Sequence, residues 1–308
     1  MIKLFSGSAH PGLTNEVAGI LNMPVSESHV LRFGNSEVKV TIKADVRNQT
    51  AVVLQPTTNP TDTHLMELCL FCDALRRSEA SKVIGVIPYF GYAKQNIQHQ
   101  PGECVSVNVV IRFLESLGFA KIYTFDLHDE ATAGVFSIPF KNVSALPYLA
   151  KHVRAYFERE KMPLTDIAVV SPDQGAVEKV RNFGTVFYGT DQFSECVIEK
   201  KRDQHVAHQA KPMDLYGDVN GKIAVIVDDM VVSGSTVIPA VELCLERGAT
   251  KVYAAVVHHD FTENAPQLLQ NSRLERFFTT NTIPLDSSQH FDKLEEISIA
   301  PLIAEELK

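Results

Sequence analysis

The sequence predicts an α/β fold made of two similar units, each a mainly parallel sheet flanked by helices. Short β-branched runs alternate with helical patterns almost from end to end of the 308 residues, and this alternation is typical of parallel sheets covered by helices. A chain of this length exceeds one ordinary domain, so we expect two hydrophobic cores. A short internal repeat indicates the same division.

The predicted elements follow from hydrophobic periodicity. Strands are expected at Ile2–Phe5, Glu37–Ala44, Ala51–Gln55, Val83–Pro88, Lys121–Phe125, Ile167–Ser171, Ile223–Asp228 and Val252–Val257. Helices are expected at Thr63–Ser78, Val105–Leu117, Leu146–Arg159 and Thr236–Arg247. The segment Glu37–Ala44 alternates apolar and polar residues in strict period two, which favours a half-exposed antiparallel strand or flap beside the main sheet.

The internal repeat joins a strand to a helix in each half of the chain. The first copy is Ala51-Val-Val-Leu-Gln-Pro followed by Glu67-Leu-Cys-Leu, and the second is Ala224-Val-Ile-Val-Asp-Asp followed by Glu242-Leu-Cys-Leu. We infer a duplicated α/β unit, although the general pattern of βαβ units is an alternative explanation for so short a match.

The duplication places a boundary near Ser144–Pro147 and predicts one unit over residues 1–145 and another over 146–308. Where the first copy has Gln55 and Pro56, the second has Asp228 and Asp229. If the halves are homologous, only the second kept an acidic pair.

Composition and charge exclude several classes of protein. Hydrophobic residues make up 45% and charged residues 21%, as in ordinary globular proteins. The net charge of -8 argues against a nucleic-acid partner, which would require a basic face. The sequence has no signal-peptide pattern and no apolar run of about 18 residues, so we expect a cytoplasmic protein with no membrane partner.

The five cysteines are odd in number and lie in apolar contexts, so disulfides are not expected. Cys69 and Cys72 have the C-x-x-C spacing of redox and zinc sites. No second pair follows, and the surrounding apolar residues recur at helical spacing, which favours core packing over chemistry.

The most specific segment is Ala224-Val-Ile-Val-Asp-Asp-Met-Val-Val-Ser-Gly-Ser-Thr236. A buried strand delivers Asp228 and Asp229 at its carboxyl end, where ligands bind in open α/β sheets. The following turn, with Ser233, Gly234, Ser235 and Thr236, opens a helix and directs N–H groups and hydroxyls at one point, which suits a phosphate. An acidic turn and an ordinary helix cap are the structural alternative.

This segment resembles the phosphoribosyl-pyrophosphate signature of type I phosphoribosyltransferases and ribose-phosphate pyrophosphokinases. Further motifs are similar to the pyrophosphokinases alone, in the same order: Ile87-Pro-Tyr-Phe-Gly-Tyr-Ala-Lys-Gln, Thr124-Phe-Asp-Leu-His, Val170-Ser-Pro-Asp-Gln-Gly and Ile198-Glu-Lys-Lys-Arg. The resemblance covers nearly the whole chain and implies two phosphoribosyltransferase-like domains, with the ribose 5-phosphate loop in the second.

By this resemblance, His128 and Asp173 bind magnesium, and Lys200 and Arg202 form the catalytic basic pair. A cation would neutralise phosphate oxygens during diphosphoryl transfer, and fixed basic groups would stabilise charge on the transferring group. Taken alone, His128 reads as a structural hydrogen-bonding group, Asp173 as a turn residue, and Lys200 with Arg202 as a solvated charge run.

The resemblance is weakest at the nucleotide site. Phe33, Asn35 and Glu37 match the family's adenine loop, where Asn35 replaces an acid, and Lys94 and Gln95 begin the run that contacts the triphosphate. That run lacks the family's arginines, and each lost bidentate contact is worth roughly 1.5–3 kcal/mol. In the ribose loop, Val232 replaces a common acid.

The resemblance therefore implies an enzyme that moves the β,γ-diphosphoryl group of ATP, or of another nucleoside triphosphate, to ribose 5-phosphate with Mg²⁺. It also implies a homo-oligomer, a hexamer or a dimer. Two alternatives stay open: a non-catalytic regulatory homologue, favoured by the changes at Asn35, Ile97 and Gln98, and a phosphoribosyltransferase, which would need a nucleobase site and no triphosphate.

Overall fold

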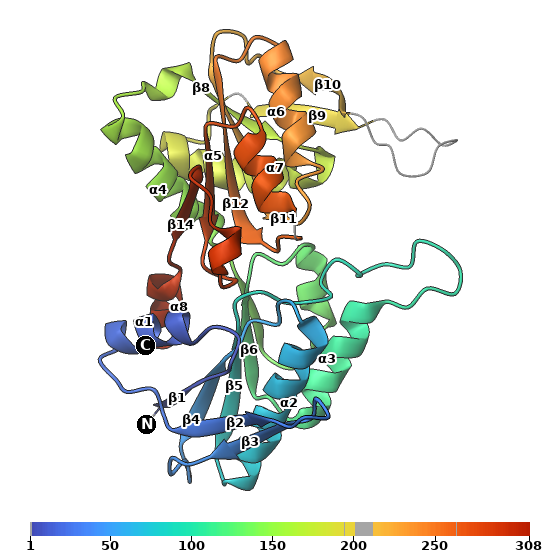
Figure 1. The fold of residues 1–308 in the computed structure, drawn as a ribbon, viewed down its shortest axis with the longest axis vertical. Coiled ribbons are helices and arrows are strands. Elements are labelled where there is room, and N and C mark those ends of the chain that lie inside the picture. Colours follow the sequence, from blue (N-terminus) through green and yellow to red (C-terminus); the bar gives the residue numbers. More distant parts are fainter. Residues whose placement is uncertain (1, 194, 201–211, 263) are drawn as a thin grey trace. The chain divides into compact units, whose positions relative to one another are not determined.

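The computed structural model describes residues 2–193, 195–200, 212–262 and 264–308, with Lys200, Pro212 and Met213 described by their backbone. The chain divides into two compact units (Figure 1). The first comprises Met1–Val143, Thr282–Pro284 and Ser298–Lys308, and the second comprises Ser144–Asn281 and Leu285–Ile297.

The first unit is built on a parallel sheet in the order β1-β4-β5-β6-β7. Its strands are β1 (Ile2–Ser6), β4 (Thr50–Leu54), β5 (Lys82–Ile87), β6 (Lys121–Phe125) and β7 (Phe140–Val143). Its helices are α1 (Pro11–Ile20), α2 (Thr61–Arg77), α3 (Ser106–Leu117) and α8 (Ala300–Glu306), and η1 (Glu130–Val135) is a 3-10 turn. The segment predicted as an antiparallel strand is β3 (Val38–Ile42), which pairs with β2 (Ser28–Arg32) in a separate hairpin, as expected.

The second unit has the sheet order β10-β9-β8-β11-β12-β13-β14, in which only β10 is antiparallel to its neighbour among the described strands. Its strands are β8 (Ile167–Ser171), β9 (Glu195–Lys200), β10 (Pro212–Tyr216), β11 (Ile223–Val231), β12 (Lys251–His259), β13 (Arg276–Thr280) and β14 (Leu294–Ile297). Its helices are α4 (Leu146–Arg159), α5 (Val177–Tyr188), α6 (Val237–Glu246) and α7 (Ala265–Asn271), with 3-10 turns η2 (Leu164–Asp166), η3 (Gln174–Ala176) and η4 (Ser287–Gln289).

The helices form where apolar residues recur at helical spacing. In α3, Val107, Val110, Ile111 and Leu114 are buried on one face, and these side chains pack into the core of the first unit. The helix ends at Gly118, whose φ of 94° is a left-handed conformation that an L side chain rarely adopts. The α/β architecture predicted from the sequence is thus confirmed.

The two units repeat the same order of elements. Strands β1, β4, β5, β6 and β7 correspond to β8, β11, β12, β13 and β14, and both sets are parallel and adjacent in the same order. The predicted internal repeat falls on β4 with α2 in one unit and on β11 with α6 in the other. The shared topology supports a duplication beyond the short sequence match.

The helix that follows the last strand of each half belongs to the other unit. Helix α4 follows β7 of the first unit but packs against α5 of the second, and α8 follows β14 of the second unit but packs against α1 of the first. In the first unit, the Tyr123 hydroxyl donates a hydrogen bond to the Glu306 carbonyl oxygen at 3.1 Å, and Lys141 Nζ lies 2.6 Å from Glu306 Oε1. The first unit therefore includes residues 298–308, which differs from the expected division at 145/146.

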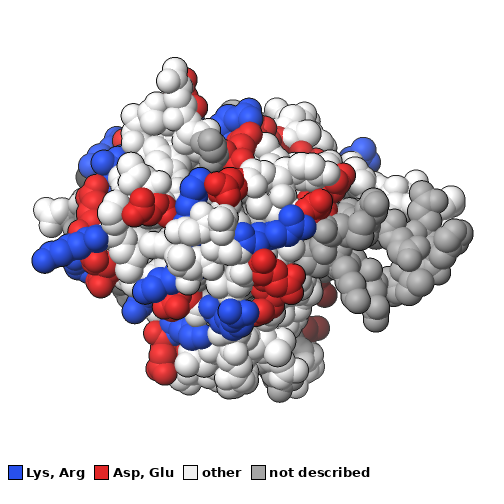
Figure 2. All heavy atoms as spheres, turned by 90° about the horizontal axis from the view of Figure 1, so that it is seen from above, with Lys and Arg blue, Asp and Glu red and all other residues white. Residues whose placement is uncertain are grey.

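Surface charge is mixed on the face that Figure 2 shows, where Lys and Arg side chains lie among Asp and Glu side chains. Among the helices of the described residues, none combines the length and the apolar character that crossing a membrane requires.

Candidate active site

The acidic pair lies on the central strand β11. Residues Ala224–Val227 are fully buried because β11 runs between β8 and β12 and is covered by helices. Asp228 and Asp229 follow, with exposed fractions of only 9% and 2%. The strand was expected to end at Asp228, but it continues to Val231 because Met230 and Val231 stay in register with β12. The carboxyl groups therefore have a rigid backbone on both sides.

The two carboxyl groups share a buried environment with a lysine. The Asp229 N–H donates a hydrogen bond to Asp228 Oδ1 at 2.9 Å, and Lys179 Nζ lies 2.8 Å from Asp229 Oδ1. Burial raises the pKa of Asp228 well above its ordinary value, and the negative charges of Asp229 and Asp173 raise it further while Lys179 opposes the shift. The site therefore holds two adjacent carboxyl groups and one ammonium group that are largely removed from water.

The turn after β11 presents hydroxyls at the start of α6. Gly234 has a φ of 79°, and a Cβ there would lie 3.0 Å from Ile238 Cδ1, so a larger residue would strain the turn. The side chains of Ser233 and Ser235 are exposed, and the Ser233 hydroxyl donates to the Ser235 hydroxyl at 2.9 Å. The side chain of Thr236 makes no capping hydrogen bond at the N-terminus of α6. This arrangement suits a phosphate monoester.

Asp173 lies beside the acidic pair, in the loop after β8. Its Oδ1 accepts a hydrogen bond from the Ala176 N–H at 3.2 Å, and its carbonyl accepts one from the Ser171 hydroxyl at 2.6 Å. Its charge acts on Asp228. The second unit thus brings together Asp173, the acidic pair and the hydroxyl turn, all from the carboxyl edge of its sheet.

The first unit holds His128 in the loop after β6, where its side chain is exposed. The neighbouring Asp129 accepts a hydrogen bond from Asn96 Nδ2 at 2.6 Å, so this loop is joined to the segment that begins at Lys94. Lys94 and Gln95 are exposed, and Gln95 Oε1 accepts a hydrogen bond from the Ser106 hydroxyl at 2.5 Å. His128, Lys94 and Gln95 therefore occupy connected loops after β5 and β6.

The turn of the β2–β3 hairpin carries the other residues expected at a nucleotide site. The Phe33 N–H donates to the Glu37 carbonyl at 2.8 Å, and the Glu37 N–H donates to Asn35 Oδ1 at 3.2 Å. The Phe33 ring is 46% exposed, so its face is accessible for stacking on a base. Asn35 has a structural role in the turn, because its side-chain oxygen already accepts this hydrogen bond.

The proposed catalytic basic pair falls largely outside the described residues. Lys200 is the last residue of β9 and pairs with Pro212 of β10 through the backbone. The side chain of Lys200 and the whole of Arg202 lie outside the part of the chain that the structure describes.

Sequence reasoning missed Lys179. It lies in the first turn of α5, where a charged residue is usually a solvated surface group, yet its side chain is only 18% exposed. The one signal in the sequence was that Lys179 follows Asp173 by a few residues. The helix α5 that carries Lys179 begins at the same sheet edge at which β11 presents the acidic pair.

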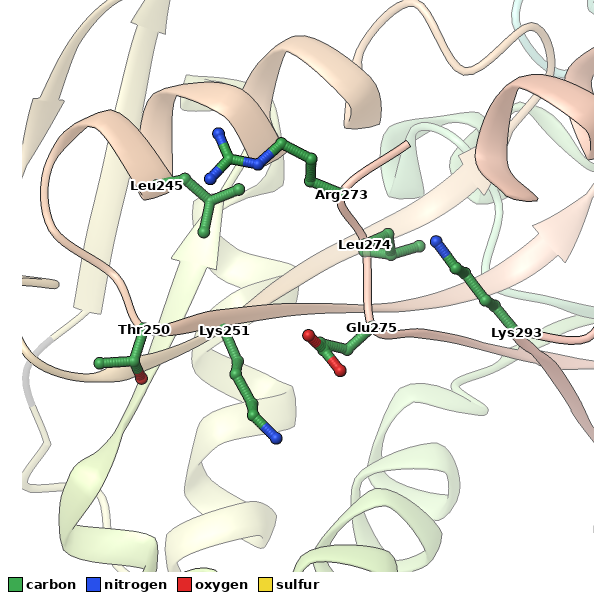
Figure 3. Close-up of a pocket in the computed structure, with 7 residues that line it drawn as sticks. All are labelled: Leu245, Thr250, Lys251, Arg273, Leu274, Glu275 and Lys293. Carbon is green, nitrogen blue, oxygen red and sulfur yellow. The ribbon is translucent and has the colours of Figure 1, made fainter. Parts of the chain in front are cut away.

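A hollow of about 370 Å³ lies at the other edge of the second sheet, near the start of β12 and β13 (Figure 3). It is lined by Leu245, Thr250, Lys251, Arg273, Leu274, Glu275 and Lys293. Lys293 Nζ donates to the Ser272 carbonyl at 2.7 Å, and Arg273 pairs with Glu242 at 3.3 Å. Two of its basic side chains, Lys293 and Arg273, already bind groups of the protein itself. We therefore assign this hollow no part in the chemistry.

Duplicated parallel α/β units, with a buried acidic pair followed by a hydroxyl turn at a helix N-terminus, have the architecture of the phosphoribosyltransferase-like class of proteins. Two family models match the chain: the N-terminal domain of ribose phosphate pyrophosphokinase over residues 2–118, and the phosphoribosyl synthetase-associated domain over residues 141–308. The chain belongs to the ribose-phosphate pyrophosphokinase family.

Individual relatives match over the full length of the chain. Ribose-phosphate pyrophosphokinase A of Dictyostelium discoideum is 35% identical over 100% of this chain and 94% of that protein. The ribose-phosphate pyrophosphokinase of Wolinella succinogenes is 36% identical over 99% of this chain and 94% of its own length. The crystal structure of phosphoribosylpyrophosphate synthetase from Mycobacterium smegmatis superimposes with a TM-score of 0.90 at 32% identity, covering 99% of this chain and 97% of that chain.

Proposed function

We propose that the chain transfers the β,γ-diphosphoryl group of ATP to the C1 hydroxyl of ribose 5-phosphate, giving phosphoribosyl pyrophosphate and AMP. The observation that carries the proposal is the buried Asp228–Asp229 pair beside the hydroxyl turn Ser233–Thr236, in a chain that belongs to this enzyme family. The C1 hydroxyl oxygen forms a bond to the β-phosphorus, the bond from that phosphorus to the α,β-bridging oxygen breaks, and the hydroxyl proton is lost.

The sugar phosphate is held at both ends by this site. Asp228 and Asp229 accept hydrogen bonds from the ribose hydroxyls, since carboxyl oxygens are hydrogen-bond acceptors. The N–H groups and hydroxyls of Ser233, Gly234, Ser235 and Thr236 bind the 5-phosphate at the positive end of α6. Binding at both ends fixes the reacting hydroxyl in place, which is the main contribution of positioning to catalysis.

Mg²⁺ belongs to the proposal, and the resemblance to the family assigns His128 and Asp173 to its binding. Among the described residues, no three His, Cys, Asp or Glu side chains form a cluster that could enclose a metal. Magnesium in enzymes that use nucleotides commonly keeps several waters and is held by one or two protein groups together with substrate phosphates. When bound, the ion supplies positive charge to the phosphate oxygens.

Lys200 and Arg202 are proposed to stabilise negative charge on the transferring group. Lys200 ends β9, a strand of the same sheet as β11, which supports this proposal. On the nucleotide side, Phe33 stacks on the base and Lys94 and Gln95 contact the triphosphate. Because Ile97 stands where the family has a charged residue, we propose that ATP binds more weakly here than in the relatives.

The test is formation of AMP from ATP that requires both ribose 5-phosphate and magnesium. Turnover that depends on both would support the proposal, and Asp229→Asn is the matched variant because it removes charge without changing size. Absence of turnover with every nucleoside triphosphate would favour a regulatory homologue. Release of pyrophosphate that depends on a nucleobase would favour a phosphoribosyltransferase.

The proposal also includes a cytoplasmic location and assembly into homo-oligomers, as the resemblance to the family implies. Light scattering of the purified chain across a range of concentrations measures the oligomer mass directly.

A further inference from the structure

Lys179 forms a largely buried ion pair inside the acidic site. Its Nζ lies 2.8 Å from Asp229 Oδ1, and the side chains of Lys179 and Asp229 are 18% and 3% exposed. An ammonium group that is removed from water must be compensated by its partner. The contact is therefore a fixed part of the site, unlike the exposed ion pairs elsewhere on the surface.

Without this lysine, the acidic pair would offer a divalent cation two adjacent carboxylates on β11. Among the described residues, no three His, Cys, Asp or Glu side chains form a group that could hold a metal, so a cation here would be bound by one or two carboxylates and water. Hard cations such as Mg²⁺ and Mn²⁺ prefer carboxylate oxygens and bind them directly at about 2.0–2.2 Å. An ammonium at 2.8 Å from Asp229 Oδ1 and a metal ion at that oxygen would repel each other strongly.

The chemistry of a lysine differs from that of a metal in one relevant respect. Its ammonium offers three donors and no acceptor, so it neutralises Asp229 without drawing further anionic ligands into the site. A carboxylate has about four lone-pair positions. Pairing with one ammonium group therefore uses only part of the hydrogen-bonding capacity of a carboxylate.

We infer that Lys179 is a positioning residue that keeps divalent cations off Asp229 in the absence of sugar, so that the acidic pair is reserved for ribose hydroxyls. The part of this inference that concerns ribose rests on the proposed function. The exclusion of the cation is independent of it and follows from the ion pair alone. Lys179 thus helps to separate the place where the sugar binds from the place where the metal binds.

The experiment is a calorimetric titration of the full chain with Mn²⁺ alone, without sugar or nucleotide. Lys179→Met should gain a Mn²⁺ site that binds at least about tenfold more tightly than any site of the unchanged chain, because a neighbouring positive charge has been removed. Lys179→Arg keeps the charge and should behave like the unchanged chain. Equal Mn²⁺ affinity in Lys179→Met and the unchanged chain would overturn the inference.

A double variant assigns the gained site to the acidic pair. Lys179→Met combined with Asp229→Asn should lose the gained Mn²⁺ site, whereas retention of the site would place it elsewhere and contradict the inference. Lys179→Gln serves if the methionine variant does not fold, because its amide can still donate to Asp229 without a charge, and the same gain is expected.

The titration separates this inference from the proposed function. Failure of the unchanged chain to bind ribose 5-phosphate would remove the proposed function and leave the Mn²⁺ result intact. Conversely, normal sugar binding together with no gain of Mn²⁺ affinity in Lys179→Met would reject the role of Lys179 alone. Sugar affinity that falls in Lys179→Met only when Mn²⁺ is present would confirm that the two ligands compete at Asp229.

Discussion

The backbone N–H of Asp229 donates a hydrogen bond to Oδ1 of Asp228 at 2.9 Å, so two adjacent buried carboxyl groups are held on one strand. Burial and the charge of Asp229 raise the pKa of Asp228 well above its ordinary value of 3.8. A buried carboxyl group with a raised pKa lowers the free energy of unfolding at neutral pH, so its presence indicates a role in binding rather than in stability.

Asp228→Asn should therefore stabilise the protein at neutral pH. The folded chain binds more protons than the unfolded chain between pH 3.8 and the raised pKa of Asp228, so stability falls as pH rises through this window. Asparagine keeps the acceptor oxygen for the Asp229 N–H and removes the charge. We expect an increase in the free energy of unfolding, measured by urea denaturation at pH 7.

The same variant should show a flatter dependence of stability on pH above about pH 4. Asp191→Asn is the control, because Asp191 is exposed and its charge is solvated in both states. If Asp228→Asn proved less stable than the unchanged chain at pH 7, the carboxyl would have to be ionised and favourably paired in the folded state.

Asp229→Asn should weaken binding of ribose 5-phosphate by roughly 10- to 100-fold, because hydrogen bonds to a charged acceptor contribute about 1.5–3 kcal/mol. The measurement is the KM for ribose 5-phosphate at saturating ATP. The KM for ATP should change little, since the proposed nucleotide contacts come from other loops. Unchanged kinetics for the sugar would remove Asp229 from the ribose site.

Lys200→Ala should lower kcat by about 100-fold or more while the affinity for both substrates changes little, as expected for a group that acts on the transition state. Steady-state kinetics together with calorimetric binding separate the two effects. A loss of affinity at unchanged kcat would instead assign Lys200 to substrate binding.

Ile97→Arg should tighten ATP binding by about tenfold, because a guanidinium group makes charge-assisted hydrogen bonds to phosphate oxygens. The side chain of Ile97 is 55% exposed, so the substitution costs little packing. Ile97→Gln is the control for polarity without charge. An unchanged KM for ATP in Ile97→Arg would mean that the triphosphate does not pass this loop.

Ile303→Ala should destabilise the first unit, although Ile303 lies near the far end of the sequence. Ile303 is fully buried in α8, and removal of a buried isoleucine side chain typically costs about 2–5 kcal/mol. Hydrogen exchange should rise first in α1 and β1. The exposed Ile20→Ala is the matched control, and faster exchange confined to the second unit would contradict the assignment of α8.

The sequence predicted the elements that depend on local periodicity. Lys121–Phe125, Ile167–Ser171 and Leu146–Arg159 have the expected bounds, because a run of buried residues is a strong signal. Strands β2, β7, β9, β10, β13 and β14 were missed. β7, β10 and β14 lie at sheet edges, where polar residues blur the pattern, whereas β9 and β13 lie between two neighbouring strands. Helices α1, α5, α7 and α8 were also missed, and α1 begins with Pro11 and Gly12.

The candidate site could be proposed from the sequence because one short segment carries most of its residues. Asp228, Asp229 and the turn Ser233–Thr236 stand together in the sequence, and β11 brings them to one sheet edge. Lys179 was not predictable, because its role depends on a contact across 50 residues of chain that gives no local pattern. The place of α8 was hidden for the same reason, since the packing of a short amphipathic helix depends on long-range contacts.

Helix α4 follows the first half of the sequence but packs in the second unit, and α8 follows the second half but packs in the first. This arrangement affects the order in which the units can fold during synthesis. Domains that are continuous in sequence fold in the order of their synthesis, but here the residues that close the first unit, 298–308, are translated after the whole second unit. The surface of α1 that α8 covers therefore stays exposed until synthesis of the chain is almost finished. We expect both units to complete their folding at nearly the same time.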